Sequence, residues 1–278
     1  MSGFSPEWLA LREPVDHRSR DAGVAEQLRA QFTDRDSIRV VDLGCGTGSN
    51  LRGTFHLLPD EQHWTLVDYD QQLLSAARQS ISDWADRHEA GKDELTVYKD
   101  GKVLRIGFRS VDLNADLDRA LGTTTDLITA SAFFDLCSTT FIERFSAAVA
   151  RLKAVFFTVL TYNGEQQWSP SHPADAKMLA AFCAHQTSDK GFGPSAGPSA
   201  AAALRTSFEA AGYDVTEGDS PWIIDASDRQ LIADLATGFA GAVTETGAVD
   251  ASRIASWSAV ARDGAVVGHT DTLALPPR

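Results

Sequence analysis

The chain has 278 residues, and its 25 lysines and arginines against 38 aspartates and glutamates give a formal net charge of −13 at pH 7. Because this charge repels phosphate backbones, it argues against sequence-independent binding to nucleic acid and favours a small or cationic partner. Hydrophobic residues make up 43% and charged residues 23% of the chain, as in ordinary globular proteins, which excludes a disordered chain.

The first part of the chain predicts a helical cap followed by alternating strands and helices. Ser5-Pro6 is a helix start signal, and the β-branched run IRVVDL at 38–43 is typical of a buried strand. The predicted elements are a helical cap at 5–32, strands at 38–43 and 63–70, and helices at 49–58 and 71–88. Strands that alternate with helices favour a parallel sheet with right-handed crossovers.

The second part predicts a hairpin, further strands and a long insert. Asp100-Gly101 is a hairpin turn signal between strand-like runs at 94–100 and 102–112. Beyond it we expect strands at 126–132, 153–162, within 213–224 and at 266–275, and helices at 138–152, 174–188, 199–211, 227–246 and 250–261. The segment 163–198 is longer than a typical connection, which indicates either a functional lid or a plain surface loop.

The run VVDLGCGTGSN after the first strand carries the most specific pattern in the chain. Gly44, Gly46 and Gly48 allow a sharp turn from strand to helix and a ligand against bare backbone. The third glycine of a dinucleotide fingerprint would fall at Ser49, and no lysine follows as in a P-loop. The Asp42 carboxylate would repel a pyrophosphate and attract a cationic ligand. S-adenosylmethionine fits, because it carries an ammonium group and a sulfonium and has no phosphate.

Two further acids follow the ends of neighbouring predicted strands. Asp68 closes the second strand, where an acid can accept hydrogen bonds from ribose hydroxyls. Asp112 follows the strand of FRSVDL, where it would meet an adenine amino group. Since ligands of open α/β sheets bind at the carboxyl ends of the strands, these two acids and Asp42 are expected to converge on one crevice.

The segments VVDLGCGTGSN, LVDYD, SVDL and DLITASAFFDL, in this order and spacing, resemble the successive motifs of the class I S-adenosylmethionine-dependent methyltransferases. The resemblance covers residues 38–162 and implies S-adenosylmethionine as the cofactor and methyl transfer to a small-molecule acceptor. It implies contacts to the methionine part, the ribose, the adenine and the sulfonium. The implied residues are Asp42, Gly44, Gly46 and Gly48 for the methionine part, Asp68 for the ribose, Asp112 and Leu113 for the adenine, and Thr129, Ala130 and Ser131 for the sulfonium. Cys45 and Tyr69, in the same motifs, are also expected to bind the cofactor.

The predicted fold is a single α/β domain with a doubly wound, seven-stranded Rossmann-like sheet whose last pair is partly antiparallel. Its expected parts are a helical cap at 1–36, a cofactor-binding core at 37–162, a lid insert at 163–198 after the fifth strand, and a C-terminal part at 199–278. The extra C-terminal helices are expected to cover the pocket or to form a homodimer surface.

Candidate catalytic residues come from two places, although methyl transfer requires a general base only when the acceptor is protonated. Asp135 follows the fourth strand and Tyr162 ends the fifth. His185 and Asp189 stand four apart near the end of a predicted helix, where the acid could orient and charge the imidazole. The structural alternatives are that Asp135 is an acid at a helix N-terminus, and that His185 and Asp189 form a solvated pair at the helix end. Arg18 could pair with the methionine carboxylate.

Two other function classes stay open on the sequence. A regulatory module would bind the cofactor without turnover, and a nicotinamide-dependent oxidoreductase is disfavoured by Ser49 and Asp42. Three scattered cysteines without a CxxC pair predict neither disulfides nor a metal site and favour a cytoplasmic protein. No signal-peptide pattern and no long uncharged apolar run occur, so no membrane segment is expected.

Overall fold

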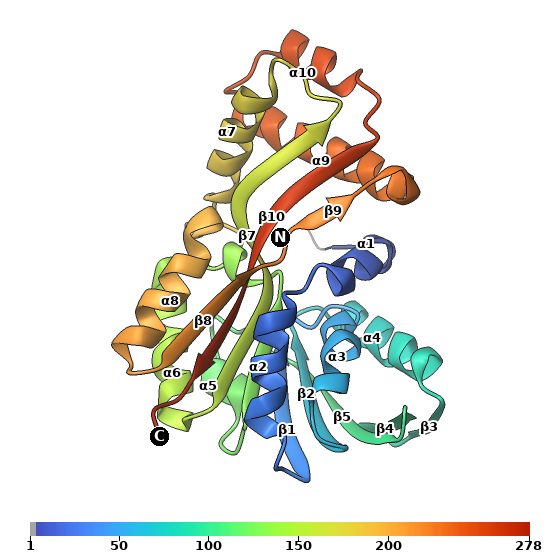
Figure 1. The fold of residues 1–278 in the computed structure, drawn as a ribbon, viewed down its shortest axis with the longest axis vertical. Helices are drawn as coiled ribbons and strands as arrows, with labels where there is room; N and C mark the ends of the chain where they lie inside the picture. Colours follow the sequence, from blue (N-terminus) through green and yellow to red (C-terminus); the bar gives the residue numbers. More distant parts are fainter. Residues whose placement is uncertain (1–3) are drawn as a thin grey trace.

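The computed structural model describes residues 4–278 and places ten strands in one sheet (Figure 1). The strand order is β3-β4-β5-β2-β1-β6-β7-β10-β8, and β9 pairs with β10 beside this path. The strands are β1 (Ser37–Leu43), β2 (Glu61–Asp68), β3 (Arg87–Ala90), β4 (Glu94–Lys99), β5 (Lys102–Ser110), β6 (Leu127–Ser131), β7 (Val155–Ser169), β8 (Asp214–Asp219), β9 (Trp222–Ile224) and β10 (Gly264–Leu275). The α-helices are α1 (Pro6–Arg18), α2 (Ala22–Phe32), α3 (Ser49–Thr54), α4 (Gln71–Trp84), α5 (Leu117–Leu121), α6 (Thr139–Leu152), α7 (Asp175–Gln186), α8 (Ala200–Ala210), α9 (Arg229–Thr246) and α10 (Ala251–Ser258). Short 3₁₀ turns are η1 (Phe55–Leu57), η2 (Phe134–Leu136), η3 (Gly197–Ser199) and η4 (Ala226–Asp228).

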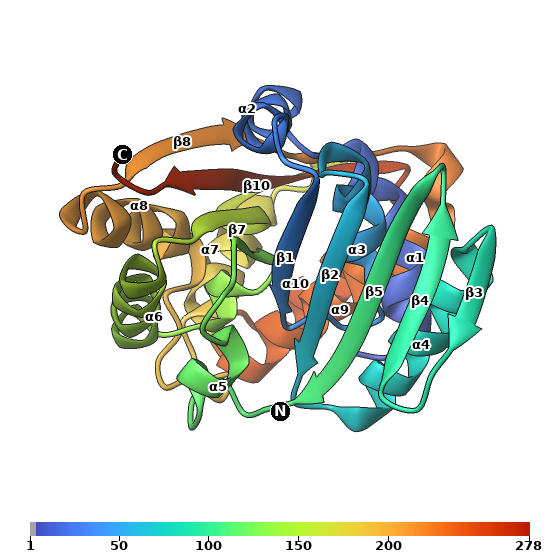
Figure 2. The ribbon, with the colours of Figure 1, turned by 90° about the horizontal axis from the view of Figure 1, so that it is seen from below.

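The centre of the sheet is parallel and is covered by helices on both faces. β5, β2, β1, β6 and β7 run parallel, and β10 lies antiparallel between β7 and β8. α2, α3 and α4 pack on one face around Trp64 and Ile81, whereas α5, α6 and α8 pack on the other around Phe145 and Phe156 (Figure 2). The doubly wound sheet with an antiparallel last pair is therefore confirmed.

Two features of the sheet differ from the prediction, and a third agrees with it. The strand count of seven is wrong, because the sheet has ten strands. β3 lies where a helix was expected, and the range 213–224, where one strand was expected, holds both β8 and β9. The helix expected at 71–88 ends at Trp84, since Arg87–Ala90 pairs with β4 as an edge strand. The hairpin is confirmed, with Asp100 (φ 49°) and Gly101 (φ 81°) in the turn between β4 and β5.

Beyond the parallel strands, β7 and β10 continue as a two-stranded ribbon into an upper lobe, formed by residues 163–190 and 222–267 (Figure 1). β9, α7, α9 and α10 complete this lobe, and its centre is aromatic. Trp168, Phe239 and Trp257 pack with ring centroids 5.2 to 5.6 Å apart. The ribbon is irregular where the lobe begins, because residues 163–165 of β7 bulge opposite Gly268.

The predicted first residue of the lid insert, 163, is too early, because β7 continues to Ser169. Residues 163–169 continue β7, because the first residues of β10 offer them an antiparallel partner. The remainder of the insert holds α7, and the helices expected before the last strand are α9 and α10. No helix within residues 4–278 is long and apolar enough to cross a membrane.

Asp271 of β10 ties the N-terminal helices to the sheet. Its carboxylate accepts hydrogen bonds from the backbone nitrogen of Asp21, at 2.9 Å, and of Leu160, at 2.8 Å. Asp271 is 1% exposed, so the two bonds hold the start of α2 against β7 in a dry environment.

Candidate functional site

The glycine loop joins β1 to α3 in a backbone conformation that favours glycine. Gly44, Gly46 and Gly48 have φ angles of 60°, 52° and 78°. A Cβ atom at Gly44 would lie 2.7 Å from the ring of Phe133, and one at Gly48 would lie 2.8 Å from Cδ1 of Ile81. The loop therefore requires glycine both for its conformation and for the close approach of neighbouring side chains.

Asp42, at the end of β1, is fully buried behind this loop. Its Oδ1 accepts a hydrogen bond from Nδ2 of Asn50 at 2.7 Å, while its Oδ2 has no partner among the residues that the structure describes. Burial raises the pKa of Asp42 to about 7, although the Asn50 hydrogen bond and the charge of Arg20 lower it. The charge of Asp68 also contributes to raising this pKa.

The other two acids lie at the same carboxyl edge of the sheet. Asp68 ends β2 and accepts hydrogen bonds from the backbone nitrogens of Gly46, at 2.9 Å, and Asp70, at 3.0 Å. Burial raises the pKa of Asp68. Asp112 is exposed and accepts a hydrogen bond from the backbone nitrogen of Asn114 at 2.9 Å. These carboxylates can take hydrogen bonds from hydroxyl or amino groups, and they repel phosphate.

The remaining residues implied for the cofactor surround the same edge. Cys45 is buried, and burial raises the pKa of its thiol, which fits a small packing residue. Leu113 and Ala130 are buried in the core, and Ser131 is half-buried at the end of β6. Tyr69 is 61% exposed beside the loop. Two buried residues also meet here, since Asn50 Nδ2 lies 3.1 Å from Oγ1 of Thr129.

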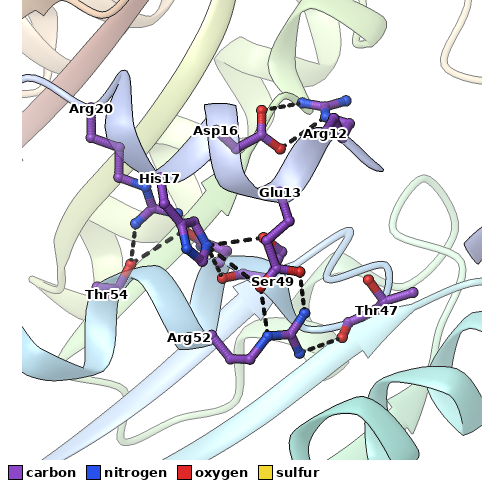
Figure 3. A network of polar contacts seen from close by, with 10 residues as sticks. Arg12, Glu13, Asp16, His17, Arg20, Thr47, Ser49, Arg52 and Thr54 are labelled. Atoms are coloured by element: carbon purple, nitrogen blue, oxygen red, sulfur yellow. Dashed lines mark hydrogen bonds and ion pairs between the residues drawn. The ribbon is translucent and has the colours of Figure 1, made fainter. Parts of the chain in front are cut away.

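Helix α1 lies across the glycine loop and α3 (Figure 3). Glu13 pairs with Arg52, whose Nη1 donates to the Thr47 carbonyl at 2.9 Å. Nε2 of His17 lies 3.0 Å from the Ser49 carbonyl, and Leu9 reaches within 3.1 Å of a Cβ position at Gly46. The predicted N-terminal cap therefore covers the loop directly.

The structure gives Arg18 a different partner from the predicted one. Its Nη2 donates to the Asp228 carboxylate at 2.5 Å and to the Ile223 carbonyl at 3.4 Å. The side chain is 44% exposed, because it lies on the face of α1 that meets the upper lobe. This position does not support a role for Arg18 in binding the methionine carboxylate.

The predicted pair His185 and Asp189 is not formed. α7 ends at Gln186, so the helical spacing does not extend to Asp189. Nε2 of His185 instead lies 3.0 Å from the carboxylate of Glu245, and Asp189 accepts hydrogen bonds from the backbone nitrogens of Gly191 and Gly193. The alternative of a solvated His185–Asp189 pair at the helix end is not formed either, because Glu245 is the partner of His185 and Asp189 orders the loop.

Asp135 and Tyr162, the other two catalytic candidates, are both buried, and their elements, η2 and β7, pack against each other. Asp135 in η2 is 8% exposed and Tyr162 in β7 is 5% exposed. Burial is the main cause of the raised pKa of Tyr162, with smaller contributions from Cys183 and from the charge of Asp135. The sequence did not indicate that His269 of β10 would pack against Tyr162, because β10 lies more than 100 residues further along the chain. Within the described range, no cluster of three or more His, Cys, Asp or Glu side chains is placed to hold a metal ion.

No protein-family model matches the sequence, and no curated protein matches it. The fold does match solved structures. A cyclopropane-fatty-acyl-phospholipid synthase-like protein from Lactobacillus casei is 12% identical, with a TM-score of 0.51 over 94% of this chain and 98% of that one. The YcgJ protein from Bacillus subtilis is 12% identical, with a TM-score of 0.50 over 93% of this chain and 100% of that one. The cyclopropane synthase MmaA2 from Mycobacterium tuberculosis is 12% identical, with a TM-score of 0.49 over 98% of this chain and 94% of that one.

The fold is the Rossmann-like α/β fold that the motif resemblance implies, so the prediction is confirmed at the level of the fold. Identities of 12% show the shared fold alone.

Proposed function

We propose that this protein transfers a methyl group from S-adenosylmethionine to a small-molecule acceptor. The observation that carries the proposal is the glycine loop with an acid at the end of each adjacent strand, Asp42 on β1 and Asp68 on β2, and Asp112 just beyond β5. Such an edge suits a cationic nucleoside and disfavours a nucleotide, because buried carboxylates repel phosphate groups.

The donors and acceptors at this edge fit the cofactor. The unpaired oxygen of Asp42 would face a ligand ammonium group, and Asp68 would accept hydrogen bonds from ribose hydroxyls. When bound, S-adenosylmethionine supplies an electrophilic methyl group on its sulfonium. Helix α1 would exclude water from the loop through Leu9 and through the Glu13–Arg52 pair.

The choice of a small acceptor rests on charge. A formal charge of −13 disfavours a polyanionic substrate, and the carboxyl edge itself carries the acids named above. Because the methyl group is already activated, the residues of the chain act mainly by holding the two reactants in line.

Calorimetric titration with S-adenosylhomocysteine tests the proposal. The native protein is expected to bind it, and Asp68→Asn is expected to weaken binding by about tenfold or more, as for the loss of a charged hydrogen bond. Asp86→Asn serves as the matched control, because Asp86 pairs with Lys99 at the far edge of the sheet. Absence of binding, undiminished binding by Asp68→Asn, or saturable binding of NADH alone would overturn the proposal.

A further inference from the structure

A second buried polar cluster lies beside the glycine loop and draws on five separate elements. It consists of Arg12 (α1), Tyr162 (β7), Trp222 (β9) and His269 (β10), together with Asp135 of η2, a turn that packs against β7. His269 and Tyr162 are direct partners in the β7–β10 ribbon, with ring centroids 6.2 Å apart. The Trp222 ring lies 5.3 Å from that of His269 and 5.1 Å from the Arg12 guanidinium carbon.

The ribbon is built so that the imidazole enters this cluster. The bulge of residues 163–165 opposite Gly268 comes directly before the His269–Tyr162 pair. A Cβ atom at Gly268 would lie 2.7 Å from Cβ of Glu165, so the chain has glycine at the point of closest approach. Bulges of this kind redirect side chains and are frequent next to active sites.

The one cation of the cluster is already paired. Arg12 donates to Asp16 through Nε, at 2.9 Å, and through Nη2, at 3.2 Å. Nε1 of Trp222 donates to the same carboxylate at 3.0 Å. Arg12 and Asp16 therefore neutralise each other, and the pair offers little attraction to an anionic ligand.

Two buried atoms of the cluster are left without hydrogen bonds. Oδ1 of Asp135 and Nδ1 of His269 have no partner anywhere in residues 4–278, although the side chains are only 8% and 6% exposed. A buried polar atom without a partner costs about 1–3 kcal/mol, so two of them in one cluster indicate a place where a ligand completes the hydrogen bonding.

The ionisation of the cluster selects the ligand. Burial raises the pKa of Asp135 to about 6, although the charge of Arg12 lowers it. Asp135 is therefore mostly ionised at neutral pH. Burial and the Arg12 charge lower the pKa of His269 to about 3, so its imidazole is neutral. Burial raises the pKa of Tyr162, which keeps the phenol protonated beside Cys183. With Arg12 and Asp16 balanced, the net charge of the cluster is negative.

The cluster adjoins the cofactor side of the site through Phe133. This ring covers Gly44 of the glycine loop, and Asp135 follows only two residues later. We propose that Asp135 and His269 bind the methyl acceptor, and that this acceptor is a small uncharged or cationic molecule that donates a hydroxyl or amino hydrogen to them. The aromatic rings of the cluster would contact its apolar part. This inference rests on the proposed function and adds the site and the charge class of the acceptor.

Three probes of similar size test the charge class, namely benzyl alcohol, benzylamine and benzoate. The full-length protein, saturated with S-adenosylhomocysteine and labelled in its histidines, is titrated with each probe while the imidazole resonances are followed by NMR. Benzyl alcohol and benzylamine are expected to shift the His269 resonance in a saturable way, and benzoate to bind at least tenfold more weakly. The His185 resonance, in the exposed pair with Glu245, is the internal control and should not move.

Variants separate this inference from the proposed function. The resonance that disappears in His269→Gln is that of His269. If this variant does not fold, Trp222→Phe identifies the same resonance through the changed ring current. Asp135→Asn is expected to reduce benzylamine binding at least tenfold while its affinity for S-adenosylhomocysteine stays within threefold of native. Preferred binding of benzoate, or no shift of His269 with any probe, overturns the inference even if the cofactor analogue binds. If the analogue fails to bind, the proposed function fails, and the titrations repeated without it still show whether the cluster prefers uncharged and cationic probes.

Discussion

Replacement of the buried carboxylate by an amide, Asp42→Asn, is expected to change the pH dependence of stability. The isosteric asparagine can keep the hydrogen bond that Asn50 donates to Oδ1, so the substitution mainly removes the titrating group. Burial raises the pKa of Asp42 in the folded protein to about 7, whereas the pKa of an aspartate in the unfolded chain is about 4.

The sign and size of the effect follow from this difference. The folded protein holds the proton more tightly than the unfolded chain, so the stability contributed by protonated Asp42 is fully present below about pH 4 and is lost as the pH rises towards 7. At about 1.4 kcal/mol for each pKa unit, the whole change is about 4 kcal/mol as an upper bound. The variant should therefore gain stability relative to the native protein as the pH rises.

Urea unfolding at intervals from pH 5 to pH 8 measures this relative gain. A constant offset between native protein and variant is expected from the altered hydrogen bonding, so the slope of the difference against pH is the diagnostic quantity. Asp60→Asn, whose carboxylate is 82% exposed, is the control and should run parallel to the native protein. A flat difference for Asp42→Asn, or a difference that falls with pH, would contradict a raised pKa of Asp42 in the folded protein.

Three further outcomes are expected. Gly268→Ala should destabilise the protein by about 1–3 kcal/mol in urea unfolding, because the added Cβ would overlap Glu165. The control Gly238→Ala, with open space around it in α9, should be neutral or stabilising. Equal effects of the two substitutions would contradict this expectation. Asp271→Ala should cost about 1–3 kcal/mol for each of the two backbone N–H groups that lose their acceptor, and an unchanged urea midpoint would contradict it. Arg18→Ala should leave the calorimetric affinity for S-adenosylhomocysteine unchanged, and a tenfold loss would restore its predicted role.

Local patterns predicted the parallel strands and the glycine loop well. The loop carries its own signal, because the turn conformation that the structure adopts at Gly44, Gly46 and Gly48 is one that glycine favours. Asp42 and Asp68 could be located for the same reason, since each ends a strand that is apolar enough to be recognised. A residue within or directly after a strand with a clear apolar pattern can be placed in the fold from that pattern alone.

The errors arose where the outcome depends on contacts distant in the sequence. β3 has four exposed residues and no apolar alternation, so only its pairing with β4 makes it a strand. The strand at 163–169 buries Gln166 and Trp168 alternately, a signal that could have extended β7, but its polar composition pointed to a loop. The partner of Arg18 lies 210 residues away, beyond the reach of any helical spacing.

The upper lobe consists of two stretches of sequence that meet only in the folded protein. Deletion of residues 163–190 alone would leave residues 264–267 of β10 without their antiparallel partner on β7. The lobe is therefore not a cassette that can be exchanged in one piece. A chimera that carries the upper lobe of another protein must transplant 163–190 and 222–267 together, with its junctions on the two strands at the bulge, where the register of the ribbon already changes.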